Sequence, residues 1–192
     1  MACGEDGSYL LRNRSAMRVS IIRALLAVTL LVSGRAAGAA SDTPLAVGAP
    51  APPVDEPTTA GRFDSTTSGK PYVLEFFAVW CPHCQREAAV VNELQTADGN
   101  RVDVIAVPAS PFSFDRTTIL QQSDLDAFAA RYHVRYRIGF DGLYALSNEY
   151  GVDAFPTFYF VTRNRTIAAV ESGEIPFERL HADVDALFAP PR

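Results

Sequence analysis

The chain has 192 residues, of which 48% are hydrophobic, and its formal net charge is −5 at pH 7. This length and hydrophobic content suit one globular domain with a core large enough to fold without disulfide staples. The acidic balance gives no electrostatic reason to expect nucleic acid or an anionic membrane surface as a partner. Proline and glycine are at ordinary levels and no repeat is visible, which excludes solenoids and low-complexity chains.

The first predicted element is a targeting segment at residues 17–39. It contains two early arginines and then a short apolar run from Ala24 to Val32. An A-x-A cleavage pattern closes it at Ala39, so the segment predicts a secretory signal peptide. The apolar run is shorter than the roughly 20 residues of a transmembrane helix. An uncleaved N-terminal anchor stays open as the alternative.

Residues 1–16 have no structural pattern, and Met17 is the better start for the chain. We interpret 1–16 as a non-native start or a disordered extension, and Cys3 lies within it. After the signal peptide, residues 40–57 are rich in alanine and proline and predict an extended lead-in. Residues 58–190 are then the predicted single domain.

The domain begins with polar, glycine-containing loops and a marginal strand around 59–63. Residues 72–78 form a continuous run of aromatic, aliphatic and β-branched residues, which indicates a buried strand. A helix is predicted from Pro82 to about Thr96, because apolar residues recur there at helical spacing. Residues 102–107 predict a second buried strand.

The second half of the domain alternates helix and strand patterns. Ser123 with Asp126 resembles a capping box, which predicts a helix from there to about Tyr132. The remaining predicted elements are a short helix at 143–150, strands at 155–161 and 166–170, and a closing helix at 176–188. This order predicts an α/β domain with a central mixed β-sheet flanked by helices on both faces.

Beyond the predicted cleavage site the chain has two cysteines, Cys81 and Cys84. An exported protein in an oxidising compartment can hold a disulfide. A disulfide across two intervening residues, however, closes too small a loop to restrict the unfolded chain much. A redox-active pair therefore explains the two cysteines better than a structural staple does.

Residues 80–84 read WCPHC and lie directly after the first buried strand, where the helix begins. With Cys81 at the N-cap and Pro82 at the first helical position, free helix amides and the positive helix end face the Cys81 sulfur. Both favour thiolate over thiol, which makes Cys81 a nucleophile. Cys84, one turn inward, is expected to be less exposed and to resolve a mixed disulfide. His83 adds positive charge when protonated and favours the thiolate further.

The sequence VLEFFAVWCPHC at 73–84 resembles the active-site strand and turn of the thioredoxin superfamily. The stretch from Asp141 through YGVDAFPTFYFV at 150–161 resembles the TlpA/ResA branch of exported thiol–disulfide oxidoreductases, whereas the CPHC tetrapeptide is closer to DsbA. The resemblance covers roughly residues 47–188 and implies the thioredoxin fold. It also implies an extracytoplasmic enzyme that acts by thiol–disulfide exchange.

The resemblance implies roles for further residues. Glu75 stands six residues before Cys81, where thioredoxin-like proteins place a buried carboxyl that accepts the proton of the resolving cysteine. Pro156 matches the family's cis-proline, and the backbone of the residue before it, Phe155, pairs with an extended substrate. Trp80 and Pro82 complete the predicted substrate-binding rim.

The aromatic residues near the cysteine pair also have a simpler interpretation. Trp80 is explained by packing beside the active-site turn, with partner contact as a second role. Residues 108–122 show no clear period, and loop packing is the default interpretation of Phe112 and Phe114 within them.

The resemblance implies protein disulfides or dithiols as substrates and a membrane electron donor or acceptor as redox partner. We expect a monomer in the periplasm or another extracytoplasmic compartment, with no nucleic acid bound. We expect no metal and no cofactor besides the Cys81–Cys84 disulfide itself. The direction of exchange stays open: His83 favours an oxidant, while the TlpA-like body favours a reductase, which is our interpretation.

Metal binding is the alternative from another class. A tetrahedral zinc site needs four ligands, and beyond the cleavage site the chain offers only His83, His133 and His181 besides the cysteine pair. A copper chaperone that binds Cu(I) through both thiolates stays open. The absence of methionine beyond the cleavage site argues against it, because copper delivery favours a third soft ligand.

Overall fold

The structure, a computed structural model, describes residues 43–142 and 144–189. The predicted signal peptide at 17–39 and the segment 1–16 lie outside these residues. Within the described part of the chain, no helix combines the length and the hydrophobicity needed to cross a membrane.

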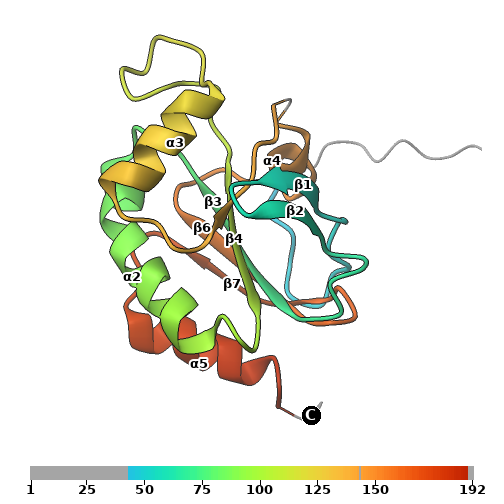
Figure 1. Cartoon of the computed structure of the whole chain (residues 1–192). Helices are drawn as coiled ribbons and strands as arrows, with labels where there is room; N and C mark the ends of the chain where they lie inside the picture. Colours follow the sequence, from blue (N-terminus) through green and yellow to red (C-terminus); the bar gives the residue numbers. More distant parts are fainter. Residues whose placement is uncertain (1–42, 143, 190–192) are drawn as a thin grey trace, which may run out of the picture. The chain divides into compact units, whose positions relative to one another are not determined.

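A five-stranded mixed sheet forms the centre of the domain, in the order β5-β4-β3-β6-β7 (Figure 1). Its strands are β3 (Tyr72–Phe77), β4 (Asp103–Pro108), β5 (Arg137–Ile138), β6 (Thr157–Val161) and β7 (Ile167–Ser172). The middle strand β3 runs parallel to β4 and antiparallel to β6. This is the mixed sheet that the sequence predicted.

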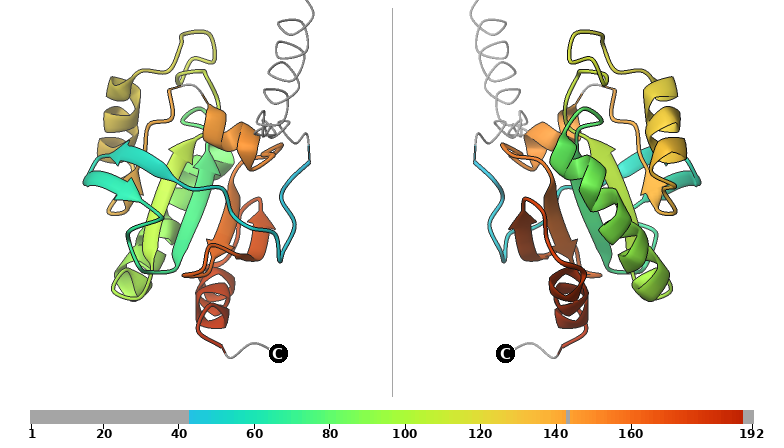
Figure 2. Two further views of the ribbon diagram at one scale, coloured as in Figure 1. Left: turned by 90° about the vertical axis from the view of Figure 1, so that its right-hand side faces the viewer. Right: turned by 90° about the vertical axis from the view of Figure 1, so that its left-hand side faces the viewer.

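Helices cover both faces of this sheet. They are α2 (Pro82–Asp98), α3 (Gln122–Arg131), α4 (Ala145–Glu149) and α5 (Phe177–Ala186). The core on one face is built with residues of α2, α3 and α5, whereas the core on the other face contains residues of α4 and of the N-terminal stretch. In Figure 2, α2 stands in front of the sheet from one side and the N-terminal stretch crosses it on the other. The predicted fold class is therefore confirmed.

Both faces of β3 are buried in the core, which explains why all of its residues except Glu75 are hydrophobic. Val73 and Phe77 contribute to the core under α2, while Leu74 and Phe76 contribute to the core under α4. Because side chains alternate along a strand, Glu75 lies on the same face as Val73 and Phe77. The strand therefore points a carboxyl group into the side of the core that carries α2.

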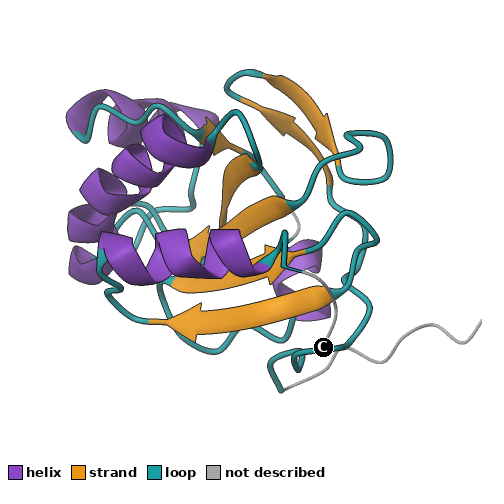
Figure 3. Cartoon of the chain, turned by 90° about the horizontal axis from the view of Figure 1, so that it is seen from below, coloured by secondary structure: helices purple, strands orange, loops and turns teal. Residues whose placement is uncertain are grey.

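The N-terminal stretch is more ordered than an extended lead-in. Its backbone bonds to the start of β7, with the Gly48 N–H donating to Ile167 O at 2.8 Å and the Ile167 N–H donating to Ala49 O at 3.0 Å. A separate antiparallel hairpin of β1 (Asp55–Thr58) and β2 (Gly61–Asp64) follows, and Figure 3 shows it set apart from the main sheet. The marginal strand expected at 59–63 corresponds to β2, which begins two residues later because the turn occupies 59–60, and the preceding strand β1 was missed.

Two other expectations differ from the structure. The capping box of α3 uses Gln121 and Asp124 rather than Ser123 and Asp126, because a glutamine side chain takes the place of the serine hydroxyl. The two-residue strand β5 was missed, since so short a strand carries no period of its own. The other strands and helices lie within a few residues of their predicted positions.

Candidate active site

The end of β3 leads directly into the turn that carries both cysteines. Cys81 is the N-cap of α2 in extended backbone conformation, and Pro82 occupies the start of the helix, where a missing N–H costs nothing. The Gln85 N–H donates to Cys81 O at 3.0 Å and closes the first helical turn. The Cys81 side chain takes no capping hydrogen bond. The helix amides that were expected to face the Cys81 sulfur therefore make no capping bond to it.

The two thiols are free and differ in their surroundings. Both cysteines are buried, with exposed fractions of 5% for Cys81 and 1% for Cys84. Burial raises the pKa of the Cys84 thiol, and the charge of Glu75 raises it further. Cys84 therefore stays protonated until a base removes its proton, which leaves Cys81 as the residue that a partner meets first.

Glu75 lies beneath this pair, as expected. It is buried in β3 between Ala106 and Phe158 on the neighbouring strands, with 2% of its surface exposed. Burial, and then the charge of Glu87, raise the pKa of Glu75 to about 8. Its Oε2 atom is buried and bonds to none of the described residues. Such an oxygen is available to take a proton from a neighbouring thiol.

The sequence interpretation missed a second buried carboxyl, Glu87. It lies one turn after Cys84 on α2, and three residues apart on a helix places two side chains on the same face. Its two carboxyl oxygens accept the Ile175 N–H at 3.2 and 3.3 Å. Burial raises the pKa of Glu87 to about 7, against the lowering effect of that bond. In the sequence, the three-residue spacing between Cys84 and Glu87 was the feature that could have indicated this carboxyl.

Tyr136 completes the buried group and was also missed. It precedes β5, and 5% of its surface is exposed. Burial raises the pKa of the Tyr136 hydroxyl, and the charges of Glu75, Cys84 and Glu87 act in the same direction. Tyr136 therefore belongs to the same buried group as Cys84, Glu75 and Glu87, within electrostatic reach of all three.

The loop before β6 faces the cysteine pair from the other side. The Phe155–Pro156 peptide bond is cis, as the resemblance implied. The Cys81 Sγ atom lies 3.9 Å from Phe155 O, within reach of a weak S–H hydrogen bond. Pro156 is buried and Phe155 half-buried, so the backbone of Phe155 is brought directly to the nucleophile.

Trp80 connects the active-site turn to the loop after β4. Its Nε1–H donates to Ser110 Oγ at 2.8 Å, and its ring contacts Phe155 edge to face at 6.1 Å between centroids. The Arg116 guanidinium lies 5.0 Å from the Trp80 ring centroid. In the same loop Phe112 is 40% exposed. The loop-packing interpretation therefore does not account for Phe112, whereas Phe114 packs against the core.

His83 lies on the outer surface of the same turn. Its Nδ1 atom is 2.6 Å from Glu174 Oε1, and Arg86 binds the same carboxylate. Hydrogen bonds from Arg86 and His83 lower the pKa of Glu174 to about 2. The sequence predicted that His83 would add positive charge beside Cys81, but it gave no indication that a carboxylate so far along the chain would bind the imidazole.

Comparison with known proteins assigns the chain to a family. The model of the Redoxin family matches residues 46–187, well over half of the chain. The chain belongs to the Redoxin family. It is 26% identical over 148 residues to the thiol-disulfide oxidoreductase ResA of Geobacillus thermodenitrificans, covering 76% of this chain and 80% of that protein.

Solved structures with the thioredoxin fold resemble this Redoxin chain along most of their length. The thiol:disulfide interchange protein DsbE of Chlorobium tepidum is 25% identical, with a TM-score of 0.64 over 74% of this chain and 99% of that one. MTB DsbF, solved in mixed oxidised and reduced forms, is 27% identical, with a TM-score of 0.58 over 70% and 94% of the two chains. The Redoxin chain therefore has the thioredoxin fold.

His133 and His181 lie away from the cysteine pair. His181 Nδ1 lies 2.7 Å from the buried Asp98 carboxylate. His133 is exposed and lies in a left-handed turn just past α3. Among the described residues, no three histidine, cysteine or acidic side chains gather as a metal site would require.

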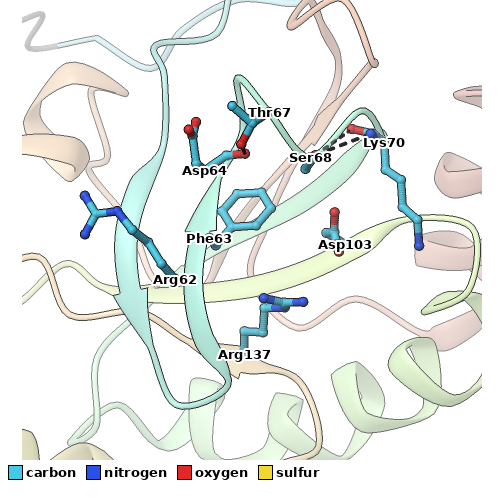
Figure 4. A pocket seen from close by; sticks show the side chains of 8 residues that line it. All are labelled: Arg62, Phe63, Asp64, Thr67, Ser68, Lys70, Asp103 and Arg137. Carbon is cyan, nitrogen blue, oxygen red and sulfur yellow. Dashed lines mark hydrogen bonds between the residues drawn. The ribbon is translucent and has the colours of Figure 1, made fainter.

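A hollow of about 460 Å³ lies elsewhere on this Redoxin (Figure 4). It is lined by residues of β2, the turn after it, β4 and β5: Arg62, Phe63, Asp64, Thr67, Ser68, Lys70, Asp103 and Arg137. Lys70 precedes β3 and Asp103 begins β4, whereas Cys81 follows the opposite end of β3. The hollow is therefore at the far end of the sheet and takes no part in chemistry at the cysteines.

Proposed function

We propose that this protein, a thioredoxin-like thiol–disulfide oxidoreductase, works outside the cytoplasm and reduces disulfides in other proteins through Cys81 and Cys84. One observation carries the proposal: a buried thiol pair at a helix N-terminus, with a cis-proline loop in front of it and carboxyls behind it. A structural disulfide would need none of these neighbours. An exchange reaction uses each of them.

The reaction proceeds in two exchanges. The Cys81 thiolate attacks one sulfur of a substrate disulfide, so that the substrate S–S bond breaks and its other sulfur leaves as a thiolate. Cys84 then loses its proton and attacks the Cys81 sulfur of the mixed disulfide. The bond between Cys81 and the substrate breaks, and the second substrate sulfur leaves as a thiolate. The two substrate thiolates take up protons to give a dithiol, and the cysteine pair, which has lost two electrons, is left as the Cys81–Cys84 disulfide.

Glu75 is the base proposed for the second exchange. Its Oε2 has no other partner among the described residues, and its charge acts on the Cys84 thiol. With a pKa of about 8, about one-tenth of the carboxyls are ionised near neutral pH, so the group both accepts and returns a proton there. In the reverse exchange the neutral carboxyl gives the proton back to the Cys84 sulfur.

The surface in front of Cys81 suits an extended polypeptide. Phe155 presents its carbonyl near the sulfur, and the exposed Pro82 and half-exposed Trp80 flank it. A substrate strand placed here would bring its own cysteine to Cys81 while its backbone lies along Phe155. This supports protein disulfides as substrates. The side chains of Trp80, Pro82 and Phe155 would then determine which substrate sequences are preferred.

Export and partners belong to the same proposal. The predicted signal peptide at 17–39 supports an extracytoplasmic location, with anchoring as its alternative. A reductase in an oxidising compartment needs a donor to regenerate its dithiol, and a membrane electron donor fits that need. We propose that the protein acts as a monomer, with the cysteine pair as its redox group and no added cofactor.

The test is the reduction potential of the purified chain, equilibrated in glutathione buffers. Cys3 is replaced by Ser so that alkylation and mass report on the Cys81–Cys84 pair alone. A potential near the thioredoxin value of about −270 mV supports a reductase, and one near about −120 mV supports an oxidant.

Cys84→Ser should accumulate a mixed disulfide with a protein substrate, and Cys81→Ser should form none through the remaining cysteine. A pair that does not cycle at all would refute the proposal, and Cu(I) titration would then test the chaperone alternative.

A further inference from the structure

The residues Gly173–Ile175, here named the 173–175 connector, join β7 to α5 and contact both halves of the active site. The Gly173 N–H donates to Pro156 O at 2.8 Å. The Glu174 carboxylate binds α2 from outside, and the Ile175 N–H donates to the buried Glu87 carboxyl. Gly173 has a φ of +89°, which other residues rarely adopt. Three consecutive residues thus hold the cis-proline loop and the redox helix together.

Glu174 binds two basic side chains of the active-site helix at once. The Nε–H of Arg86 is 3.2 Å from Oε1 and 3.1 Å from Oε2, while His83 Nδ1 is 2.6 Å from Oε1. Nδ1 also lies 3.0 Å from an Arg86 nitrogen that can only donate. A proton on Nδ1 would be donated to the carboxylate. The carboxylate therefore offsets the positive charge of Arg86, and that of His83 whenever the imidazole is protonated.

This charge balance acts on the nucleophile. The hydrogen bond to Glu174 is the main cause that raises the pKa of Arg86, and Cys81 adds a smaller electrostatic effect, so Arg86 and Cys81 lie within electrostatic reach. His83 lies two residues after Cys81 on the same turn. Positive charge near Cys81 stabilises the thiolate of the reduced form, which makes a CxxC pair more oxidising. Negative charge at the same place has the opposite effect.

We propose that Glu174 is a positioning residue that makes the Cys81–Cys84 pair a stronger reductant, by binding His83 and Arg86 and offsetting their positive charge beside Cys81. This inference rests on the proposed function and favours its reducing direction. It also weakens the argument for an oxidant from the CPHC tetrapeptide, because the histidine is present but has an acidic partner on another element.

The measured reaction is the exchange of the Cys81–Cys84 disulfide with two glutathione thiols, which gives the dithiol and one glutathione disulfide. Glu174→Gln, made in the full chain with Cys3→Ser, should shift this equilibrium toward the dithiol by about two- to fivefold, the range for exposed charge pairs. For a two-electron couple this is about 10 to 20 mV toward the oxidising end. Arg86→Gln should shift it by a similar factor in the opposite direction.

The controls separate an effect of charge from a loss of structure. Arg179 binds Glu171 in a similar ion pair that joins α5 to β7 without touching α2. Glu171→Gln and Arg179→Gln should leave the exchange equilibrium unchanged. Glu174→Asp should restore most of the wild-type value. If Glu174 only held the connector in place, Glu174→Gln and Arg86→Gln would both lower the unfolding temperature. They would not shift the exchange equilibrium in opposite directions.

The two proposals fail in different ways. If the Cys3→Ser parent cycles and Glu174→Gln has the parent's equilibrium constant, the role of Glu174 is overturned while the oxidoreductase stands. Equal shifts in Glu174→Gln and Glu171→Gln overturn it as well, because they indicate an effect of net charge alone. If the parent does not cycle, the proposed function itself is lost.

Discussion

The inner and outer sides of the active-site helix hold carboxyl groups in opposite states. On the inner side, burial raises the pKa of Glu75 to about 8 and that of Glu87 to about 7. On the outer side, hydrogen bonds from Arg86 and His83 lower the pKa of Glu174 to about 2. Near neutral pH the inner carboxyls lie within their titration range, while the outer carboxylate is ionised. Under the two proposals above, the inner side of the helix serves proton transfer and the outer side sets the electrostatics of the thiol pair.

The 173–175 connector links the two sides. Its Glu174 side chain binds the outer surface of α2, and the next residue's N–H binds the inner Glu87. A single short segment therefore places one carboxylate in solvent and stabilises another in the core. Substitutions on the two sides should have effects of different kinds, and the inner ones should be the larger.

The largest effect is expected from Glu75→Gln. The folded protein holds the Glu75 proton more tightly than the unfolded chain, whose carboxyl has an ordinary pKa of 4.5. Wild-type stability from this group is complete below that value and is lost as pH rises through about 8. Glu75→Gln cannot ionise, so its free energy of unfolding should exceed that of the wild type at alkaline pH by an amount on the order of a few kcal/mol.

Glu75→Gln should also slow the exchange while stabilising the fold. Loss of a base typically costs two or more powers of ten, and water can replace part of it, so turnover of a protein disulfide should fall about tenfold to a hundredfold. Urea unfolding across the pH range and turnover measured on the same samples check both parts. Unchanged turnover together with raised stability would leave Glu75 buried but without a role in proton transfer.

Glu87→Gln sharpens the comparison, because an amide oxygen can still accept the Ile175 N–H. The pKa of Glu87 is raised to about 7, less than that of Glu75, and the sign is the same: its stability contribution is lost as pH rises from 4.5 through about 7. We expect a gain in unfolding free energy at alkaline pH of about 1 kcal/mol or more, but less than for Glu75→Gln. The pH dependence of stability in the two single variants and the double variant measures it.

The electrostatic coupling between Glu75 and Glu87 determines the result expected for the double variant. The charge of Glu87 contributes to the raised pKa of Glu75, so the double variant should show less than the sum of the single effects. Additive effects would mean that the two carboxyls titrate independently, and the inner side would then consist of two separate sites.

The difference between the two sides also explains what the sequence could reveal. Glu75 and the cysteine pair lie on one strand and the helix start that follows it, where strand alternation and helix capping fix their positions. The cis-proline loop entered through a family resemblance. Glu174, Tyr136 and Ile175 reach the site through tertiary packing of β5, β7 and α5, and no local pattern connects residues about ninety positions apart. The hairpin β1–β2 was misread for a local reason, since its turn lies at the start of the expected strand, and β5 was missed because two residues carry no period.

The smallest effect is expected on the rim, at the contact between Trp80 and the loop after β4. Ser110→Ala removes the acceptor of the Trp80 Nε1–H, a bond of 2.8 Å, and the half-exposed indole can then bond to water. Unfolding free energy should fall by about 0.5 to 1 kcal/mol. The reduction potential should not move, because no charge changes near Cys81. Ser113→Ala in the same loop is the matched control, since Ser113 bonds to Thr118 and Arg116 through its backbone. A potential shifted by Ser110→Ala would mean that the rim, like Glu174, acts on the thiol pair, and the division between an electrostatic outer helix face and a rim that only binds substrate would not hold.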